Sequence, residues 1–436
     1  MYEYVYEYVA EKSREGNMIG YSEIAAALGL QGNVVAWAAA WDQRRLSESE
    51  PPDGWPDGQD IDRACRFLNL PAEAQAAIGE SLAWLRHCRA GRAYAWGLHR
   101  LVFEGGEGLS LLRSPWLLPA TGLHPASRMF GAVVLLAGLD RTLAATHARG
   151  IPDSIALATL EDLELWMREY LDRTGAWGFD EVHWLTAHFQ GRLCRLGRLQ
   201  YEVATWRFPF RAYQHASTHE VVVLAEAGQR FRQDGQFDGA NGITDGASAW
   251  TSQLLEGRTG ITGNPVTPEG RAVATPLTLD PSEWRIFAQT GAPVLFIHIP
   301  AGWKHGPLSP EECEASLRDA AHFFPVHFPE HSFKTFVSCA WLLDAQFGDV
   351  LPADSNIVRF QKRFYRLPEA NASDHSTMQR VFGKVLERWD QAPAATSLQR
   401  AVAAHVLGGG RWRSAAGFIP VAPGKFWSRR GASHGH

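Results

Sequence analysis

The segment from Pro293 to Asp344 constrains the fold most, because it joins two buried-strand patterns through a loop and a helix. Its first run, PVLFIHIP, is apolar and rich in β-branched residues, which favours a buried strand. The run stops at Pro300, which cannot donate to a β-ladder and therefore suits a strand end. The last run, FKTFVSCAWLLD, predicts a second buried strand. The segment is therefore expected to form a strand–loop–helix–strand unit.

The loop and the helix of this unit carry specific local signals. The loop AGWKHGPLS contains glycine and proline, which are typical of turns. Ser309 and Pro310 then supply a capping hydroxyl and a proline at the first helical position, and PEECEASLRDAAHFF continues with helical spacing. A glycine-bearing loop that leads into a helix N-terminus often binds anions, because unpaired amides point at the ligand. Most such units bind nothing, so a purely structural unit is the alternative.

Length and composition indicate a globular protein of two or three domains and argue against several classes of protein. The chain has 436 residues, and no apolar run reaches the ~20 residues of a membrane-spanning helix. The first residues, MYEYVYEYVAEKSREGNM, lack the apolar core of a signal peptide. A net charge of -5 disfavours nucleic-acid binding. Five scattered cysteines without a C-x-x-C pair indicate reduced thiols, so we expect a cytoplasmic protein with neither a nucleic-acid nor a membrane partner.

The first part of the chain predicts helices. Residues 1–100 carry apolar residues at three-to-four spacing, and helices are expected again over 124–149 and 159–175. The short apolar runs of residues 101–123 predict extended segments. The run SEIAAALGL with the helix after it distantly suggests a helix-turn-helix, so a DNA-linked regulator is an alternative to a helical packing domain. No surplus of Lys and Arg surrounds it, which favours the packing domain.

From residue 185 onwards, strand and helix patterns mix, which predicts an α/β or α+β domain. Strands are expected over 196–206, 220–227, 274–279 and 351–368, and the glycine-rich stretch 233–268 predicts loops with short strands. A short helix is expected over 279–291, and two more over 377–389 and 396–407. A glycine turn and a basic tail follow.

Most familiar catalytic motifs are missing from the sequence. The 17 histidines form loose groups, such as His215 with His219, but none has the spacing of a known zinc motif. There is no G-x-S-x-G elbow and no G-x-x-x-x-G-K-[ST] phosphate loop. Cys339 could pair with a distant histidine as a nucleophile, although a cysteine in an apolar strand is usually inert. No metal site is therefore expected.

His298 is the polar residue of the first apolar run, two residues before the loop. Alternation along a strand places it on one face with Val294 and Phe296. A neutral histidine at this position could take a proton from an attacking amine near neutral pH. The alternative is a hydrogen-bonded core histidine.

Several ordered motifs together resemble the bacterial family that joins an N-acyltransferase N-terminal helical domain to a GNAT-like C-terminal domain. They are LGRLQYE, FIHIPAG, PLSPEECEASLRDAAHFFPVHFPE, CAWLLD, LPADSNIVRFQKRF and TSLQRAVAAHVLGGG, and they cover roughly residues 180–420. One departure is Ala340 in CAWLLD, where the family usually has a serine. The resemblance implies an α+β fold class, with helical residues 1–175, a GNAT-like domain with a central splayed sheet over 176–425, and a disordered tail over 426–436.

The resemblance also implies acyl-CoA, either acetyl-CoA or a longer thioester, as co-substrate, with its pyrophosphate held by the loop after His298. The implied cofactor contacts are Ile299, Ala301, Gly302, Lys304, His305, Gly306 and Ser309. For direct transfer to a small-molecule amine, His298 is the preferred base and Glu202 the second choice. Ser338 and Cys339 are candidates for protonating the departing thiolate. The alternative function is a non-catalytic acyl-CoA-binding or protein-interaction module, and a homodimer is compatible with either.

Overall fold

The structure of the protein is a computed structural model that describes residues 19–43, 46, 50–104, 116–300, 306–370, 373–421 and 425–426. The chain divides into two compact units, Met1–Arg195 and Leu196–His436. The first unit is helical and the second combines sheets and helices, which confirms the α+β fold class. The boundary between the units falls later than the predicted one after residue 175. The predicted tail 426–436 lies outside the described residues except for Phe426.

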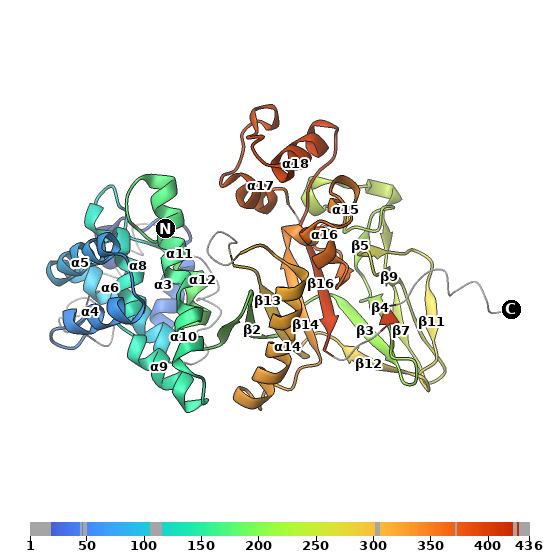
Figure 1. Cartoon of the computed structure of the whole chain (residues 1–436), viewed down its shortest axis with the longest axis horizontal. Coiled ribbons are helices and arrows are strands. Elements are labelled where there is room, and N and C mark those ends of the chain that lie inside the picture. Colours follow the sequence, from blue (N-terminus) through green and yellow to red (C-terminus); the bar gives the residue numbers. More distant parts are fainter. Residues whose placement is uncertain are drawn as a thin grey trace, which may run out of the picture. The chain divides into compact units, whose positions relative to one another are not determined.

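The described part of the first unit consists mainly of helices (Figure 1). The prediction of extended structure over 101–123 is wrong for its first residues, because α6 continues to Phe103. The bounds of the helices are α2 Tyr21–Leu28, α3 Val34–Gln43, α4 Gly58–Phe67, α5 Ala72–His87, α6 Arg89–Phe103, η2 Pro125–Met129, α8 Phe130–Leu136, α9 Leu139–Ala148, α10 Asp153–Leu160, α11 Asp162–Thr174 and α12 Val182–Phe189.

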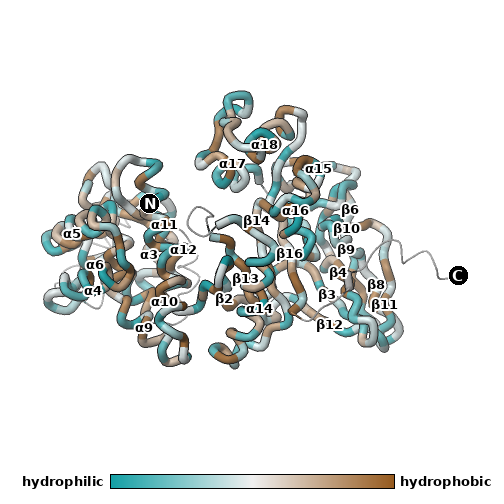
Figure 2. The backbone as a smooth tube through the Cα atoms, viewed as in Figure 1, coloured by the Kyte–Doolittle hydropathy of each residue, from teal (hydrophilic) through white to brown (hydrophobic). Residues whose placement is uncertain are grey.

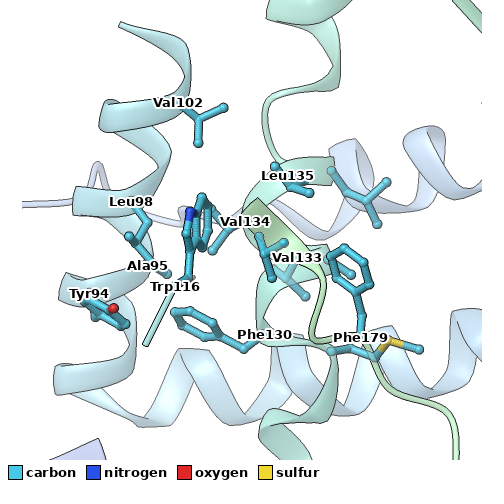
Figure 3. Packing of buried hydrophobic residues seen from close by; sticks show 14 of the residues in the cluster. Tyr94, Ala95, Leu98, Val102, Trp116, Phe130, Val133, Val134, Leu135 and Phe179 are labelled. Atoms are coloured by element: carbon cyan, nitrogen blue, oxygen red, sulfur yellow. The ribbon is translucent and has the colours of Figure 1, made fainter. Parts of the chain in front are cut away.

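Helix α8 lies in the middle of this unit, and every one of its residues is buried. Figure 3 shows its side chains packed beside Tyr94 and Leu98 of α6 and beside Phe179. Gly131 lets α12 approach α8, because a Cβ at this position would lie 2.2 Å from a methyl carbon of Val182. The continuous helix expected over 124–149 is instead broken into η2, α8 and α9. The stretch Pro125–Ala148 is apolar enough to span a membrane, yet 67% of its most apolar window is buried in the fold, as in a core helix.

A six-stranded sheet with the order β1-β2-β13-β14-β16-β15 is the centre of the second unit. The boundary between the units falls within β1. Only β13 and β14 are parallel to each other, and the other pairs for which a register is given are antiparallel. The strands of this central sheet are β1 Leu193–Leu196, β2 Leu199–Thr205, β13 Pro293–His298, β14 Thr335–Ala340, β15 Tyr365–Leu367 and β16 Ala415–Pro420.

Helix α14 (Pro310–His327) covers one face of the central sheet. Ser316 of α14 accepts a hydrogen bond from the backbone N–H of Leu199 at 3.3 Å and lies 2.9 Å from the hydroxyl of Tyr201. The helix starts at Pro310, as predicted, and ends three residues later than expected, at His327. Pro325 is tolerated within it because only the last turn loses a backbone hydrogen bond.

A second sheet packs on the opposite face of the central sheet. Its order is β10-β9-β4-β3-β12, and β17 pairs with β4. One hydrophobic cluster joins the two sheets, including Val223 from β4 and Phe296 and Phe418 from the central sheet. The hydropathy of these strands can be followed in Figure 2. The bounds are β3 Phe210–His215, β4 Glu220–Ala225, β9 Pro265–Thr267, β10 Arg271–Ala272, β12 Trp284–Ala288 and β17 Lys425–Phe426.

The remaining elements of the second unit are short. Two small sheets are formed by β11-β8-β7 and by β5-β6. The bounds of these elements are β5 Arg230–Phe231, η3 Ala240–Gly242, η4 Gly246–Ser248, β6 Trp250–Thr251, β7 Leu254–Glu256, β8 Ile261–Gly263, β11 Leu277–Leu279, η5 Trp341–Leu343, α15 Phe347–Val350, α16 Asn356–Gln361, α17 His375–Phe382, η6 Trp389–Gln391 and α18 Ser397–Leu407.

Two predictions for this unit are wrong, and one strand was missed. The helix expected over 279–291 is largely strand β12, because Trp284–Ala288 pairs with β3. The strand expected over 351–368 is helix α16 followed by β15. Ser355 caps that helix by accepting a hydrogen bond from the backbone N–H of Val358. Strand β16, which lies between β14 and β15, was not expected from the sequence at all.

Candidate functional site

His298 and Glu202 lie side by side on the central sheet. The antiparallel register of β2 and β13 places His298 opposite Gln200 and Phe296 opposite Glu202, with all four side chains on the face that meets the second sheet. The Nε2 atom of His298 lies 3.1 Å from Oε2 of Glu202. Their side chains are 16% and 23% exposed, so solvent and a substrate can reach the pair.

This hydrogen bond determines which ring nitrogen of His298 can accept a proton. When Nε2–H donates to the Glu202 carboxylate, Nδ1 is the ring nitrogen that carries the lone pair. A carboxylate that holds a histidine in one tautomer also stabilises the imidazolium formed when the ring takes a proton. The two residues that the sequence offered as alternative bases are therefore one hydrogen-bonded pair, with His298 able to accept the proton and Glu202 able to orient it.

The two parallel strands separate beside this pair. The register of β13 and β14 contains only the pairs Leu295 with Phe336 and Phe296 with Val337, although both strands continue for two residues or more. Beyond this point the hydroxyl of Ser338 donates a hydrogen bond to the carbonyl of Ile297 at 3.1 Å. Ser338 is 1% exposed. Its side chain thus bridges the two strands where their backbone pairing stops.

Cys339 lies on the other face of β14 from Ser338, the face that carries His298. Its thiol donates to Oε2 of Glu369 at 3.5 Å. Burial, reinforced by the Glu369 carboxylate, raises the pKa of Cys339 to about 12, so the thiol is protonated at neutral pH. Of the four predicted catalytic residues, His298, Glu202 and Cys339 share one face of the sheet and Ser338 does not.

Two further residues, which no sequence motif indicated, contact side chains on this face. Glu369 accepts the hydrogen bond of Cys339, and the guanidinium of Arg207 lies 5.3 Å from the centre of the Phe296 ring. The same ring lies 4.8 Å from the ring of His298. Arg207 follows Trp206 just after β2, so only the register of the sheet, and no motif, brings it near His298.

Arg198 holds the two ends of the connection between β13 and α14. It is 6% exposed, and its guanidinium donates to the carbonyls of Pro300 at 3.0 Å and of Pro307 at 3.2 Å. Burial lowers the pKa of Arg198 from its usual value. Arg198 and Gln200 both belong to the LGRLQYE motif, which is the sequence signal that could have identified them.

The predicted cofactor contacts fall around this connection. Ile299 follows the end of β13 and is partly buried. Gly306 has a φ of 74°, a left-handed conformation that favours glycine. Ser309 caps α14, because its hydroxyl accepts a hydrogen bond from the backbone N–H of Glu312 at 3.2 Å. The other predicted contacts, Ala301, Gly302, Lys304 and His305, lie outside the described residues.

Nothing in the described part of the chain resembles a metal centre. Among those residues, no group of three or more His, Cys, Asp or Glu side chains could hold a metal ion. The chemistry that the described site offers is proton transfer by the His298–Glu202 pair, beside parallel strands that part at their carboxyl ends.

Two family models match the chain. The N-acyltransferase N-terminal domain matches residues 59–191, and the GNAT-like C-terminal domain matches residues 193–419, which is more than half of the chain. No curated protein matches the sequence.

Solved structures of acyltransferases have the same fold over most of the chain. An acyltransferase mutant in complex with octanoyl-CoA is 23% identical, with a TM-score of 0.65 over 92% of this chain and 99% of the other. An acyltransferase in complex with decanoyl-CoA and teicoplanin is 24% identical, with a TM-score of 0.64 over 92% of this chain and 100% of the other. At this level of identity, the similarity establishes the fold.

Proposed function

The chain is an acyltransferase of the family that joins an N-acyltransferase N-terminal domain to a GNAT-like C-terminal domain, and we propose that it moves an acyl group from acyl-CoA to an amine. The acceptor in this proposal is a small molecule, and the transfer is direct. The observation that carries the proposal is the His298–Glu202 pair at 3.1 Å, beside the point where β13 and β14 separate.

The ligands of similar proteins support this choice of substrates. The solved structures of similar fold contain octanoyl-CoA in one case and decanoyl-CoA with teicoplanin in another. A complex that holds an acyl-CoA together with a second small molecule is the arrangement expected of a two-substrate transferase. Medium-chain acyl-CoA thioesters are therefore the first substrates to test on this chain.

In the proposed reaction, the amine nitrogen attacks the carbonyl carbon of the thioester. A C–N bond forms, the C–S bond breaks, and Nδ1 of His298 takes the proton that the nitrogen loses. Glu202 stabilises the resulting imidazolium. CoA leaves as a thiolate and takes the proton that His298 accepted, so that the products are an amide and free CoA and the imidazole is neutral again.

The proposal is tested by measuring thiol release from octanoyl-CoA and decanoyl-CoA in the presence of a panel of small amines. Amine-dependent release of CoA, with the amide identified by mass spectrometry, is the expected result. If calorimetry shows that CoA binds but no amine accelerates release, the chain is a non-catalytic acyl-CoA-binding module. If CoA does not bind at all, the proposed co-substrate is wrong.

The contacts with the CoA pyrophosphate are a separate part of the proposal. Gly306 and Ser309 lie at the start of α14, where backbone amides favour an anion. The assignment of Ala301, Gly302, Lys304 and His305 to the same phosphates stays a prediction.

A further inference from the structure

Gln200 has a buried amide group that no described residue satisfies. Its side chain is 0% exposed, and neither Nε2 nor Oε1 has a hydrogen-bond partner among the described residues. Folded proteins pair the large majority of their buried side-chain polar atoms, because an unpaired buried amide loses its hydrogen bonds to water without replacement. An amide with both ends unpaired therefore calls for an explanation.

Another buried glutamine in the same unit shows the usual arrangement. Gln361 is 1% exposed, and its Nε2 donates to the carbonyls of Leu342 at 2.6 Å and Asp344 at 2.7 Å. Its Oε1 accepts a hydrogen bond from Arg366 at 3.2 Å. A buried glutamine in this unit can therefore have hydrogen-bond partners for both its amide nitrogen and its amide oxygen. Gln200 differs, because neither atom has a partner among the described residues.

The position of Gln200 links it to the proposed base. Gln200 on β2 lies directly opposite His298 on β13, and directly opposite residues in an antiparallel pair have their Cβ atoms about 5 Å apart. Glu202 projects from the same face of β2. The three side chains differ in exposure: Glu202 and His298 are partly exposed, whereas Gln200 is fully buried.

We propose that Gln200 is a catalytic residue of the acyl transfer, whose carboxamide Nε2–H donates a hydrogen bond to the carbonyl oxygen of the thioester. The inference rests on the proposed function. When the amine attacks, this oxygen takes up negative charge, and His298 takes the proton of the amine on the same face of the sheet. The intermediate collapses when the C–S bond breaks, and the oxygen becomes the carbonyl of the amide product.

A buried amide suits this task for a physical reason. A hydrogen-bond donor stabilises developing charge more strongly where water is excluded, and a donor that is already in place needs no reorganisation during the reaction. Without substrate, the amide of Gln200 has no partner among the described residues. When the thioester binds, its carbonyl oxygen accepts the hydrogen bond of this amide.

The test replaces Gln200 with methionine, which has a similar length and no amide. We expect kcat with octanoyl-CoA to fall about 100-fold, the size of effect known for removal of one donor to an oxyanion. KM for octanoyl-CoA should stay within about threefold, because the contact strengthens only as charge develops. The Tm should be unchanged or higher, because the variant no longer buries an unpaired amide.

Gln361→Met is the matched control, because it removes a fully paired amide away from His298. Its Tm should fall, while kcat per folded molecule should stay that of the wild type. The inference is overturned if Gln200→Met keeps its kcat. It is equally overturned if Gln200→Met and a second variant, Gln200→Leu, both lose as much Tm as Gln361→Met, since the amide then has a structural role. An inactive wild type would instead refute the proposed function, and this inference with it.

Discussion

Neighbouring residues of β14 have different surroundings because side chains alternate between the two faces of a strand. The hydroxyl of Ser338 is already engaged by the carbonyl of Ile297, whereas the thiol of Cys339 lies on the face of His298 and bonds Glu369. A thiol whose pKa is raised to about 12 is a poor proton donor to a leaving thiolate, so neither side chain suits the role of general acid. Ser338 is better explained as the side chain that bridges two separating strands.

The role of Ser338 can be separated from catalysis by the variant Ser338→Ala. Loss of one buried hydrogen bond should lower the free energy of unfolding by about 1 kcal/mol. The value of kcat should stay within a few-fold of the wild type, because no proton is routed through this hydroxyl. Chemical denaturation and steady-state kinetics measure the two effects. A 100-fold loss of kcat with unchanged stability would return Ser338 to the list of catalytic residues.

Among the elements, the connection from β13 to α14 is held at both ends by the side chain of a residue that lies just before β2. Arg198, in the turn before β2, holds the carbonyls of Pro300 and Pro307, so the ends of this connection stay at a fixed separation. A planar guanidinium can reach two acceptors at once, which an ammonium group or an apolar side chain cannot do in the same geometry. Arg198 thereby couples the position of the helix start to that of the strand end.

The variant Arg198→Met should weaken binding at this connection without altering the chemistry at His298. We expect KM for octanoyl-CoA to rise about tenfold, with kcat within a few-fold of the wild type. Octanoyl-pantetheine, which lacks the pyrophosphate, is the control substrate, and its kinetics should be unaffected. Equal losses with both thioesters would show that Arg198 supports the whole domain rather than the phosphate contact.

The elements that the sequence predicted correctly have local signals. Helix α14 starts where Ser309 and Pro310 predict it, because a cap and a proline at the first position act within one turn. Strand β16 was missed because its short run AAGFIP becomes a strand only between β14 and β15, which are distant in sequence. The same limit applies to the site. His298 and Glu202 could be chosen singly, but their hydrogen bond follows from the register of β2 and β13.

At the scale of the whole molecule, buried thiols link stability to pH. Burial is the first cause that raises the pKa of four cysteines: to about 11 for Cys65 and Cys313, and to about 12 for Cys194 and Cys339. These values lie above the usual value for a thiol in an unfolded chain, so the folded state prefers the protonated thiols. Both units contain such thiols, Cys65 and Cys194 in the first and the other two in the second.

Because the folded state prefers protonated thiols, the free energy of unfolding should fall as the pH rises. Below about pH 8.5, the usual pKa of an unfolded thiol, the thiols are protonated in both states and their contribution to stability is complete. As the pH rises towards 11–12, the unfolded chain loses protons first, so the free energy of unfolding should fall by up to about 1.4 kcal/mol per pH unit for each thiol. Thermal denaturation at pH 8 and pH 10 measures the loss. A Cys194→Ala variant should lose less between the two pH values, and an unchanged difference would contradict the account.

The role of His298 is decided by comparing His298→Ala with the wild type, both in amine-dependent release of CoA from octanoyl-CoA and in calorimetric binding of CoA. With His298 as the base held by Glu202, we expect a loss of kcat of about 10²–10⁴-fold. The dissociation constant of CoA should change by less than about threefold, because His298 takes part in the reaction rather than in binding. A variant that binds CoA normally and transfers the acyl group at the wild-type rate would contradict the claim that this pair performs the chemistry.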